Sequence, residues 1–443
     1  MYKLTKLKSL YNKLIGHKNC SYCNKSFTKE LWCKECDPFM NIERWSSGNN
    51  EIDKLIKDTI YGARNENHNF LEWVPFDKFK DINQIGEGGF SKVYFATWID
   101  GPKIHKKYGI WEKRKSEPIK VALKRLNGSE NISAEYLNEI KILWDLCQIH
   151  NGCLSFYGMT KDPETEELMI ISEYADKGNL RSVISHNFNN TLWKDKLLYL
   201  HWITHGLKSL HELGYFHKDF HSGNILQVDY ETYISDFGLS GPSNKQKSDD
   251  KICGVLPYIA PEVLNEEPYS LSSDIYSFGI IMVELSSGKP PFHKIKHDIT
   301  LALEICNGLR PEFGKGTPEI YKKLAYKCMN ANSNQRPTAE ELYDIIKFWL
   351  YSNSLNTFEN YLEKEEFGYK GKEIKAMFEE ADKEIPNIST SYDKNPDAVY
   401  TSRLFTFSNL TKPVNSSIIT EYLNDEENNK DCKDSQLFDL EIS

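Results

Sequence analysis

The sequence lacks a long apolar run, an excess of basic residues and an internal repeat. No apolar run approaches the roughly 18 residues of a membrane-spanning helix, so we expect no membrane span. The first 18 residues are basic but lack the continuous apolar stretch of a secretory signal. A formal net charge of -9 argues against non-specific binding to nucleic acid. These absences favour the reducing cytosol, or the nucleus, where the ten cysteines are not expected to form a disulfide framework.

Four of the cysteines form two closely spaced pairs near the N-terminus. Cys20 and Cys23 make one Cys-x-x-Cys pair, and Cys33 and Cys36 make the other. Four thiolates in two such turns can close a tetrahedral structural zinc site, and the pairs resemble zinc knuckles. The nine-residue gap between the pairs is shorter than the common spacing, which leaves a flexible leader with unpaired thiols as the alternative.

The composition changes along the chain and predicts four segments. A cysteine-paired leader is followed by a polar linker, whose apolar residues at helical spacing predict a short helix over 51–64. The third segment passes from short β-type runs to long amphipathic helices. The last is acidic and is predicted to be mostly disordered, with one helix over 373–383. The segments are 1–45, 46–78, 79–350 and 351–443.

The third segment is long enough to bury a full core, and its order of elements predicts an α+β fold of two lobes. A charged excursion over 100–118 is predicted to be a surface loop, and 134–146 an amphipathic helix. The predicted strands of one five-stranded sheet are 79–86, 92–99, 119–126, 156–159 and 168–173. The predicted long helices are 192–213, 272–286, 299–307, 318–329 and 338–351.

Three short motifs follow one another in this segment. Val121-Ala122-Leu123-Lys124 comes first, then His217-Lys218-Asp219-Phe220-His221-Ser222-Gly223-Asn224, then Asp236-Phe237-Gly238. A glycine-rich loop, Gly86 to Val93, precedes them, and Ala260-Pro261-Glu262 follows. In this order and spacing, the motifs resemble the catalytic domain of eukaryotic protein kinases.

The resemblance covers residues 79–350 and implies the two-lobed kinase fold, with an antiparallel sheet and one helix in the first lobe and a mainly helical second lobe. Two motifs, His217 to Leu226 and Asp274 to Gly279, look like those of the tyrosine-kinase-like group. They are similar in particular to the expanded kinase families of arbuscular mycorrhizal fungi. Those kinases often carry a similar double Cys-x-x-Cys leader and a segment like Leu71 to Phe76.

The resemblance makes Lys124 the lysine that binds the α- and β-phosphates of ATP. In the family a glutamate on the next helix holds this lysine. Glu139, 15 residues further on, is the expected partner, and Glu135, on nearly the same helix face, is the weaker candidate. A strand-edge lysine that reaches solvent is the alternative.

The catalytic loop is the most specific motif. Asp219 matches the base that orients the attacking hydroxyl and accepts its proton. Asn224 and Asp236 offer the oxygen ligands that Mg²⁺ prefers. His217 and Phe237 match residues that the family buries as packing, so we expect neither to act as a base or a metal ligand.

ATP with Mg²⁺ is therefore the cofactor that the resemblance implies. Glycines let backbone amides approach phosphate oxygens, and the backbone of the hinge near Glu173 would hold the adenine edge. Taken alone, the loop would also fit a β-hairpin with a glycine bulge, since Ser91 stands where the family usually has its third glycine. The implied nucleotide-binding residues are Ile85, Gly86, Gly88, Val93, Ala122, Lys124, Glu173, Ala175 and Leu226.

Three further residues match the scaffold of the family. Glu262 and Arg336 resemble the buried ion pair that ties the activation segment to the helical lobe. Asp274 matches the helix aspartate that accepts hydrogen bonds from the backbone of the catalytic loop. The activation segment between Asp236 and Glu262 also carries serines, and a phosphate there is expected to dock on Lys218 and raise activity modestly. The best candidates are Ser243 and Ser248.

Three departures bear on the acceptor. Lys218 replaces the usual arginine, His221 stands where serine/threonine kinases usually carry a lysine, and Val255 stands where they usually carry a threonine. The expected activity is phosphorylation of serine or threonine in protein substrates during intracellular signalling, because Pro257-Tyr258 resembles that class. A tyrosine or dual-specificity kinase and a catalytically weak pseudokinase scaffold are the alternatives, and the oligomeric state is left open.

Overall fold

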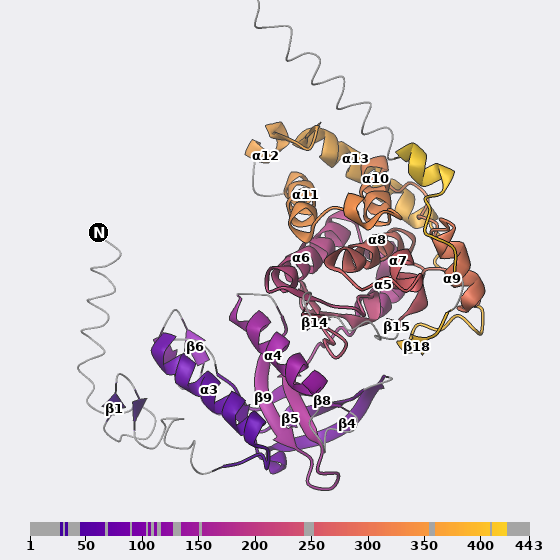
Figure 1. The fold of residues 1–443 in the computed structure, drawn as a ribbon. Coiled ribbons are helices and arrows are strands. Elements are labelled where there is room, and N and C mark those ends of the chain that lie inside the picture. The colour runs from indigo at the N-terminus through magenta and orange to yellow at the C-terminus, as the bar shows by residue number, and fades with distance from the viewer. Residues whose placement is uncertain are drawn as a thin grey trace, which may run out of the picture. The chain divides into compact units, whose positions relative to one another are not determined.

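Two units make up the part of the chain that the computed structural model describes (Figure 1). The sheet unit is Met1–Glu87, Ser91–Ser133 and Ser155–Tyr174, and the helical unit is Gly88–Phe90, Ala134–Leu154 and Ala175–Ser443. The described residues are 27–29, 32–33, 45–66, 70–88, 91–102, 105–107, 110–112, 117–126, 134–149, 153–242, 252–353, 359–407 and 410–422.

A six-stranded sheet forms the centre of the sheet unit, in the order β3-β9-β10-β8-β5-β4. Five neighbouring strands pair antiparallel, as the sequence predicts. Alternate side chains of the middle strands, such as Trp98, Val121 and Ile171, form an apolar core on one face. The strands are β3 (Glu72–Trp73), β4 (Phe79–Glu87), β5 (Ser91–Trp98), β8 (Ile119–Leu126), β9 (Phe156–Lys161) and β10 (Leu168–Glu173).

Two strand predictions in this unit are corrected. The sixth strand, β3, pairs parallel with β9 and was not expected, because two residues are too short to show an alternating pattern. The excursion over 100–118, predicted as a surface loop, contains a hairpin of β6 (His105–Lys107) and β7 (Ile110–Glu112). Each strand has only three residues, which is too short to show an alternating pattern in the sequence.

The predicted linker helix is confirmed as α3 (Asn50–Glu66). Ile52 and Ile56 are fully buried, and the Thr59 hydroxyl accepts a hydrogen bond from the backbone of Leu71. The carboxylate of Asp53, in the first turn, accepts hydrogen bonds from preceding serines. This helix is therefore packed into the sheet unit and does more than connect two domains.

The core of the helical unit receives more buried apolar residues from α6 and α8 than from any other described helix. The predicted long helices are all confirmed, with ends that differ by at most one residue. The helices are α4 (Ala134–Gln148), α5 (Leu180–Asn187), α6 (Trp193–Glu212), α7 (Pro261–Leu264), α8 (Leu271–Ser287), α9 (Ile299–Cys306), α10 (Glu319–Cys328) and α11 (Ala339–Ser352). Short strands between them are β11 (Tyr215–Phe216), β12 (Ile225–Val228), β13 (Glu231–Ile234), β14 (Gly241–Pro242) and β15 (Ile252–Gly254).

The C-terminal segment, predicted to be mostly disordered, is the largest correction. Its described residues, 359–407 and 410–422, pack on the helical unit, and Ile374, Phe378 and Ile385 are buried in the same core as α6 and α8. The predicted helix is confirmed as α13, and the rest is held by contacts that composition does not reveal. The elements are α12 (Glu359–Glu363), β16 (Glu365–Glu366), β17 (Tyr369–Lys370), α13 (Gly371–Glu384) and β18 (Arg403–Phe405).

Among the cysteines, one pair departs from expectation. Cys147, in the last turn of α4, forms a disulfide with Cys153, whereas both were expected to be buried small residues. Their Cα atoms lie 5.6 Å apart, a separation that a disulfide permits. Cys253, Cys306 and Cys328 are buried and unbonded, as expected.

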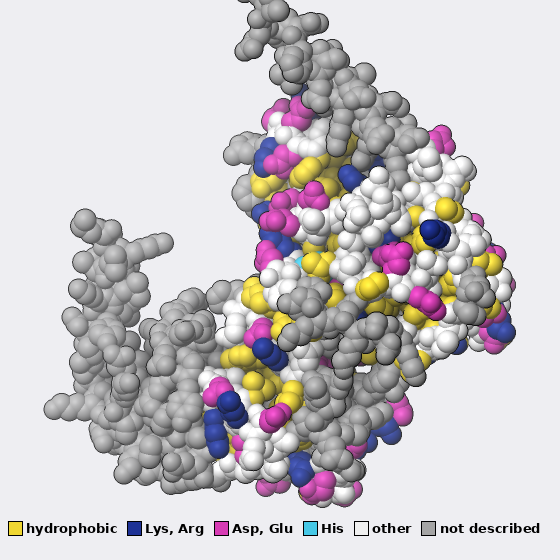
Figure 2. All heavy atoms as spheres, viewed as in Figure 1, with side chains coloured by type: hydrophobic (Ala, Val, Ile, Leu, Met, Phe, Trp, Pro, Cys, Tyr) yellow, Lys and Arg dark blue, Asp and Glu magenta, His cyan; other side chains and the backbone are white. Residues whose placement is uncertain are grey.

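The described surface mixes polar and apolar side chains. On the face in Figure 2, Lys and Arg side chains are interspersed with Asp and Glu, and apolar side chains form small groups between them. Among the described residues, no helix combines the length and the apolar content that crossing a bilayer requires.

Candidate active site

The sheet unit gathers predicted nucleotide-binding residues on one face of the sheet. Val93 on β5 lies opposite Lys124 on β8, and side chains of directly opposed residues point to the same side. Ala122, two residues before Lys124, lies on this side as well. Val121 and Leu123 alternate with them and are fully buried on the core face. Strand alternation therefore separates the candidate site from the core.

The same face continues to the glycine-rich loop. Gly86 pairs with Val93, and the half-exposed Ile85 stands beside it at a register shift in β4. At the far end of the sheet, Glu173 closes β10, where its backbone N–H donates to Ser155 O at 2.9 Å. The Glu173 carboxylate accepts a hydrogen bond from Ser155 Oγ, also at 2.9 Å. The segment predicted as the hinge therefore begins at Glu173, a strand end that two hydrogen bonds to Ser155 hold in place.

In the helical unit, two other predicted nucleotide-binding residues are brought near each other. Ala175 O accepts a hydrogen bond from Gly178 N, and Gly178 O accepts one from Gln227 N. Gln227 follows Leu226 on β12, and Leu226 forms a β-bridge with Asn179. The turn after the hinge is therefore tied to the strand that carries Leu226.

Asp274 on α8 fixes the start of the catalytic loop. Its carboxylate accepts hydrogen bonds from the backbone N–H groups of His217, at 2.8 Å, and Lys218, at 3.2 Å. Lys218 has a φ of 67°, a left-handed conformation that side chains rarely adopt without such support. The predicted role of Asp274 is confirmed by these two bonds.

The loop brings Asp219, Asn224 and the segment before Asp236 together. Asn224 Nδ2 donates to the backbone oxygen of Asp219 at 3.0 Å and to its Oδ2 at 3.2 Å. Because both partners of the amide nitrogen are oxygens, the amide orientation is settled and Oδ1 faces away from Asp219. Ser235, next to Asp236, donates from both N and Oγ to Asn224 O. The predicted base and both predicted metal ligands therefore occupy one small region.

His221 stabilises the ionised form of Asp219. His221 Nδ1 accepts a hydrogen bond from Gly223 N, so the neutral ring carries its proton on Nε2, which lies 3.6 Å from Asp219 Oδ1. Burial alone would raise the pKa of Asp219, but the His221 ring, the Ser402 hydroxyl and His217 together lower it to about 2. The balance of these effects therefore favours the carboxylate form of Asp219.

His217 and Phe237 are packing residues, as predicted. Both are buried, and their rings lie 5.2 Å apart. His217 Nε2 hydrogen-bonds Ser235 O at 3.0 Å, and burial lowers the pKa of this imidazole. A neutral histidine with both nitrogens committed to loop backbone holds the loop together and has no free role as a base.

Glu139 is buried on α4, close to Asp236-Phe237-Gly238. A Cβ placed on Gly238 would lie 3.4 Å from Glu139 Oε2 and 3.5 Å from Asp236 Oδ1, so both carboxylates flank this glycine. Asn138, the residue directly before Glu139, also reaches this segment, since its Nδ2 donates to Ser240 O. The side chain of Glu135 lies outside the described residues. The pairing of Glu139 with Lys124 stays a prediction.

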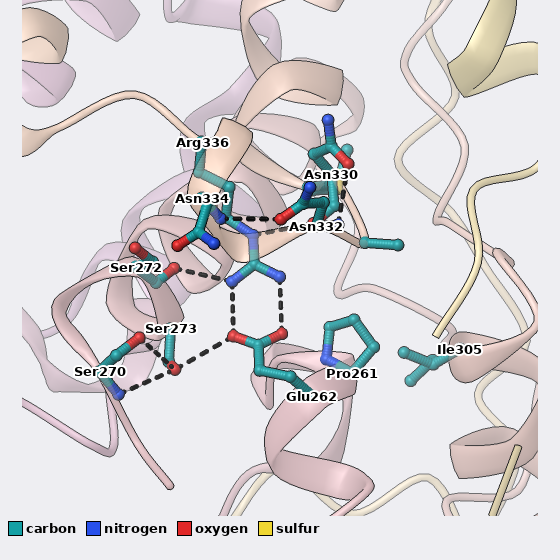
Figure 3. A network of polar contacts seen from close by, with 12 residues as sticks. Pro261, Glu262, Ser270, Ser272, Ser273, Ile305, Asn330, Asn332, Asn334 and Arg336 are labelled. Atoms are coloured by element: carbon teal, nitrogen blue, oxygen red, sulfur yellow. Dashed lines mark hydrogen bonds and ion pairs between the residues drawn. The ribbon is translucent and has the colours of Figure 1, made fainter. Parts of the chain in front are cut away.

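The predicted ion pair of the activation segment is confirmed (Figure 3). Arg336 Nη1 and Nη2 donate to the two carboxylate oxygens of Glu262 at 2.7 and 2.6 Å. Arg336 also donates to Ser272 O and Asn330 O, and Ser273 Oγ donates to Glu262. All members are buried or nearly so, and the bidentate geometry satisfies both charges.

Two groups near Asp219 were missed by reading the sequence. The hydroxyl of Ser402, 183 residues away, donates a hydrogen bond to Asp219 Oδ2. Behind His221, Tyr258 donates to Glu284 at 2.6 Å and accepts from Arg181 at 3.3 Å. The sequence does not reveal these contacts, because each residue reaches the loop from a separate element.

The four predicted zinc ligands lie outside the part of the structure that describes side chains. Only the backbone of β1 (Phe27–Lys29) and β2 (Trp32–Cys33) is described there, and the two strands pair antiparallel. Among the described side chains, no group of three or more His, Cys, Asp or Glu residues is arranged to hold a metal ion.

Comparison with known proteins agrees with this fold and with these motifs. Residues 79–346 match the family described as protein tyrosine and serine/threonine kinase, which is about three-fifths of the 443 residues, and the chain belongs to that family.

Curated relatives include two probable serine/threonine-protein kinases of Dictyostelium discoideum. The kinase drkB is 29% identical over 60% of this chain and 36% of its own length, and pats1 is 30% identical over 66% of this chain and 9% of its own length. The G-type lectin S-receptor-like serine/threonine-protein kinase CES101 of Arabidopsis thaliana is 27% identical over 75% of this chain and 40% of its own length. The chain thus spans well under half the length of these relatives.

Proposed function

We propose that the chain transfers the γ-phosphate of ATP to serine or threonine hydroxyls of protein substrates, in the cytosol or nucleus. One observation carries the proposal: Asp219 is buried and ionised, and its Oδ2 accepts a hydrogen bond from an aliphatic hydroxyl. A carboxylate in this state orients an acceptor hydroxyl and can take its proton. The three relatives are named as serine/threonine-protein kinases, which supports the same acceptor class.

The donor set fits a magnesium nucleotide. Asn224 turns its amide nitrogen toward Asp219, which leaves Oδ1 as an oxygen ligand, and Asp236 contributes a carboxylate. Hard oxygen donors of this kind are those that Mg²⁺ prefers. Bound ATP supplies the phosphoryl group, and Mg²⁺ neutralises charge on its oxygens.

Each residue of the chain then has a separate task. Asp219 holds the acceptor hydroxyl and receives its proton, and His221 fixes the orientation of the Asp219 carboxylate through Oδ1. Lys124 contributes a positive charge for phosphate oxygens, and Val93 and Ala122 provide apolar contact for the adenine. His221 thus lies beside the Asp219 carboxylate, from a position where serine/threonine kinases usually carry a lysine.

The alternative is a pseudokinase that binds nucleotide without transferring phosphate. Radiolabelled ATP with Mg²⁺ and a generic acceptor protein, such as myelin basic protein or casein, separates the two. Asp219→Asn is expected to lower transfer on the order of a thousandfold, since a positioned base contributes about 10²- to 10⁴-fold. Asp229→Asn, in an exposed turn, is the matched control. Equal transfer by wild type and Asp219→Asn would favour the pseudokinase.

A structural zinc ion in the leader is a second proposal. We infer it from the spacing of Cys20, Cys23, Cys33 and Cys36, and the antiparallel pairing of β1 with β2 supports it, because a hairpin turns the chain back between the two pairs. Elemental analysis of the whole chain should give about one zinc per molecule. The same metal content in a Cys33→Ser/Cys36→Ser chain would contradict the site.

A further inference from the structure

The C-terminal segment supplies a strand beside the catalytic loop. β18 pairs antiparallel with β15, in the register Ile252 with Phe405, Cys253 with Leu404 and Gly254 with Arg403 (Figure 1). β15 lies in the activation segment, between Asp236 and Glu262. A Cβ on Gly254 would stand 3.4 Å from Asp219 Oδ1, so this edge of β15 ends at the proposed base. An extended peptide that pairs with this edge of β15 therefore lies next to Asp219.

Ser402 occupies the position that an acceptor hydroxyl must take. It directly precedes the strand, and its Oγ donates to Asp219 Oδ2, the oxygen that Asn224 also contacts. The adjacent Thr401 is exposed, whereas Ser402 is partly buried. The register of one strand pair thus selects one of two neighbouring hydroxyls.

Contacts on both sides of Ser402 hold this register. Before it, Tyr400 OH donates to Pro291 O at 2.8 Å, and the Arg181 guanidinium lies 4.9 Å from the Tyr400 ring centre and donates to Tyr400 O. After it, Arg403 Nη2 donates to His297 O. Further along, Phe407 is buried in the helical core. Ser402 is therefore presented by a segment anchored at each end, which is the arrangement that makes an intramolecular reaction fast.

We propose that Ser402 is an intramolecular phosphoacceptor, and that the segment around β18 binds as a substrate of its own active site. This rests on the proposed function, with Asp219 as the base. In the step, Ser402 Oγ forms a bond to the γ-phosphorus of ATP while the bond from that phosphorus to the β–γ bridging oxygen breaks. The electron pair leaves with ADP, and the hydroxyl proton passes to Asp219.

Two consequences follow for other substrates. Before the reaction, the tethered segment competes with them at an effective concentration on the order of millimolar. Afterwards, the phosphate on Ser402 carries about -1.5 to -2 charges beside the ionised Asp219, and this repulsion favours release of β18. The chain should therefore be slow toward external substrates until it has modified itself, and protein substrates should bind as strands along β15.

The first experiment maps the phosphate. Purified chain is incubated with Mg²⁺ and ATP and then analysed by peptide mass spectrometry, and we expect about one phosphate per chain on Ser402. The rate constant should not change over a hundredfold range of chain concentration, because the reaction is intramolecular. Ser402→Ala should lose this phosphate, and Ser391→Ala, an exposed serine of the same segment, should keep it. Phosphate on Thr401 instead, or a rate proportional to concentration, would overturn the assignment.

The second experiment does not depend on turnover. Hydrogen exchange of the nucleotide-free chain should show protected amides in Arg403–Phe405, and Leu404→Pro should remove this protection without harming the core, because Leu404 is 57% exposed. Rapid exchange of these amides in the wild type would refute the docked strand.

A synthetic peptide of residues 397–407 then serves as external substrate. At about 0.1 mM peptide, Leu404→Pro should raise the initial rate on the order of tenfold, because the tethered competitor is gone. Wild type should show a lag that preincubation with ATP abolishes, and Ser402→Ala should stay slow. In the wild-type chain, transfer to the peptide without phosphate on Ser402 would sink this inference and leave the proposed function standing, whereas no transfer to any acceptor would overturn both.

Discussion

The sheet unit and the helical unit build their parts of the candidate site in different ways. In the sheet unit, strand alternation places Ala122 and Lys124 on one face and the core on the other. In the helical unit, Asp219 is placed by partners that are distant in the chain: Asp274 orders its loop, and Ser402 reaches its carboxylate. In the sheet unit, a substitution in the site is therefore expected to change activity without changing stability. In the helical unit, a substitution among the residues that place Asp219 is expected to change both.

The largest expected effect is on phosphate transfer, and it tests whether activity and stability are independent in the sheet unit. Lys124→Met should lower phosphate transfer on the order of 10²- to 10³-fold, because a positioned cation that contacts transferring phosphate is lost. The free energy of unfolding should change by less than about 0.5 kcal/mol, since the side chain lies on the face opposite the core. Lys120→Met, exposed on the same strand and face, is the control for both measurements. Near wild-type transfer would show that Lys124 is not the phosphate-binding lysine.

The helical unit should respond through its stability. Arg336→Met leaves the buried Glu262 carboxylate without its bidentate partner, and we expect a loss of about 3–5 kcal/mol in denaturant unfolding. Glu319→Gln, which removes the exposed pair with Lys322, should cost less than about 1 kcal/mol. Similar losses in the two variants would mean that the buried pair is no more important than a surface contact.

Lys196 tests how the C-terminal segment is held. Its Nζ is buried 4.0 Å from the Phe188 ring centre, and burial lowers the pKa of Lys196 to about 7, although Asp382 of α13 raises it. Between pH 7 and 10.5 the unfolded chain retains a proton that the folded chain has lost, so this group makes the protein more stable as pH rises.

Lys196→Met should therefore stabilise the protein by about 2 kcal/mol at pH 6 and flatten this dependence. Thermal or denaturant unfolding at several pH values measures both effects. Lys194→Met, exposed on the same helix, is the matched control and should change neither. A destabilised Lys196→Met chain would mean that the ammonium group makes a net favourable interaction with Asp382.

The smallest expected effect lies at the start of α3. Asp53 accepts hydrogen bonds from Ser46 Oγ and from Ser47 N and Oγ. Burial acts to raise the pKa of Asp53, but these bonds outweigh it and lower the pKa. The stabilisation is thus present above the unfolded pKa of about 3.9 and disappears as pH falls through the folded value.

Asp53→Asn should cost about 1 kcal/mol at pH 7, and its difference from wild type should shrink below pH 4. Asp58→Asn, exposed on the same helix, should leave stability unchanged. A difference that grows on acidification would contradict this sign.

Much of the candidate site was predictable because its parts are contiguous in sequence. The catalytic loop places Asp219 and Asn224 five residues apart, and the ion pair of Glu262 with Arg336 follows from the family pattern. The disordered tail was a wrong prediction for a physical reason. Its buried residues, such as Ile374 and Phe378, are separated by charged ones, so the segment reads as polar until the surface that covers them is known.

Local sequence was sufficient for the identity of the fold and for a prediction of the reacting groups, since short motifs and strand alternation depend on neighbours in the chain. The location of Ser402, the pairing of β18 with β15 and the burial of α13 required the folded chain. Each of these joins segments more than 100 residues apart, and each is stabilised by surfaces that only the packed helical unit provides.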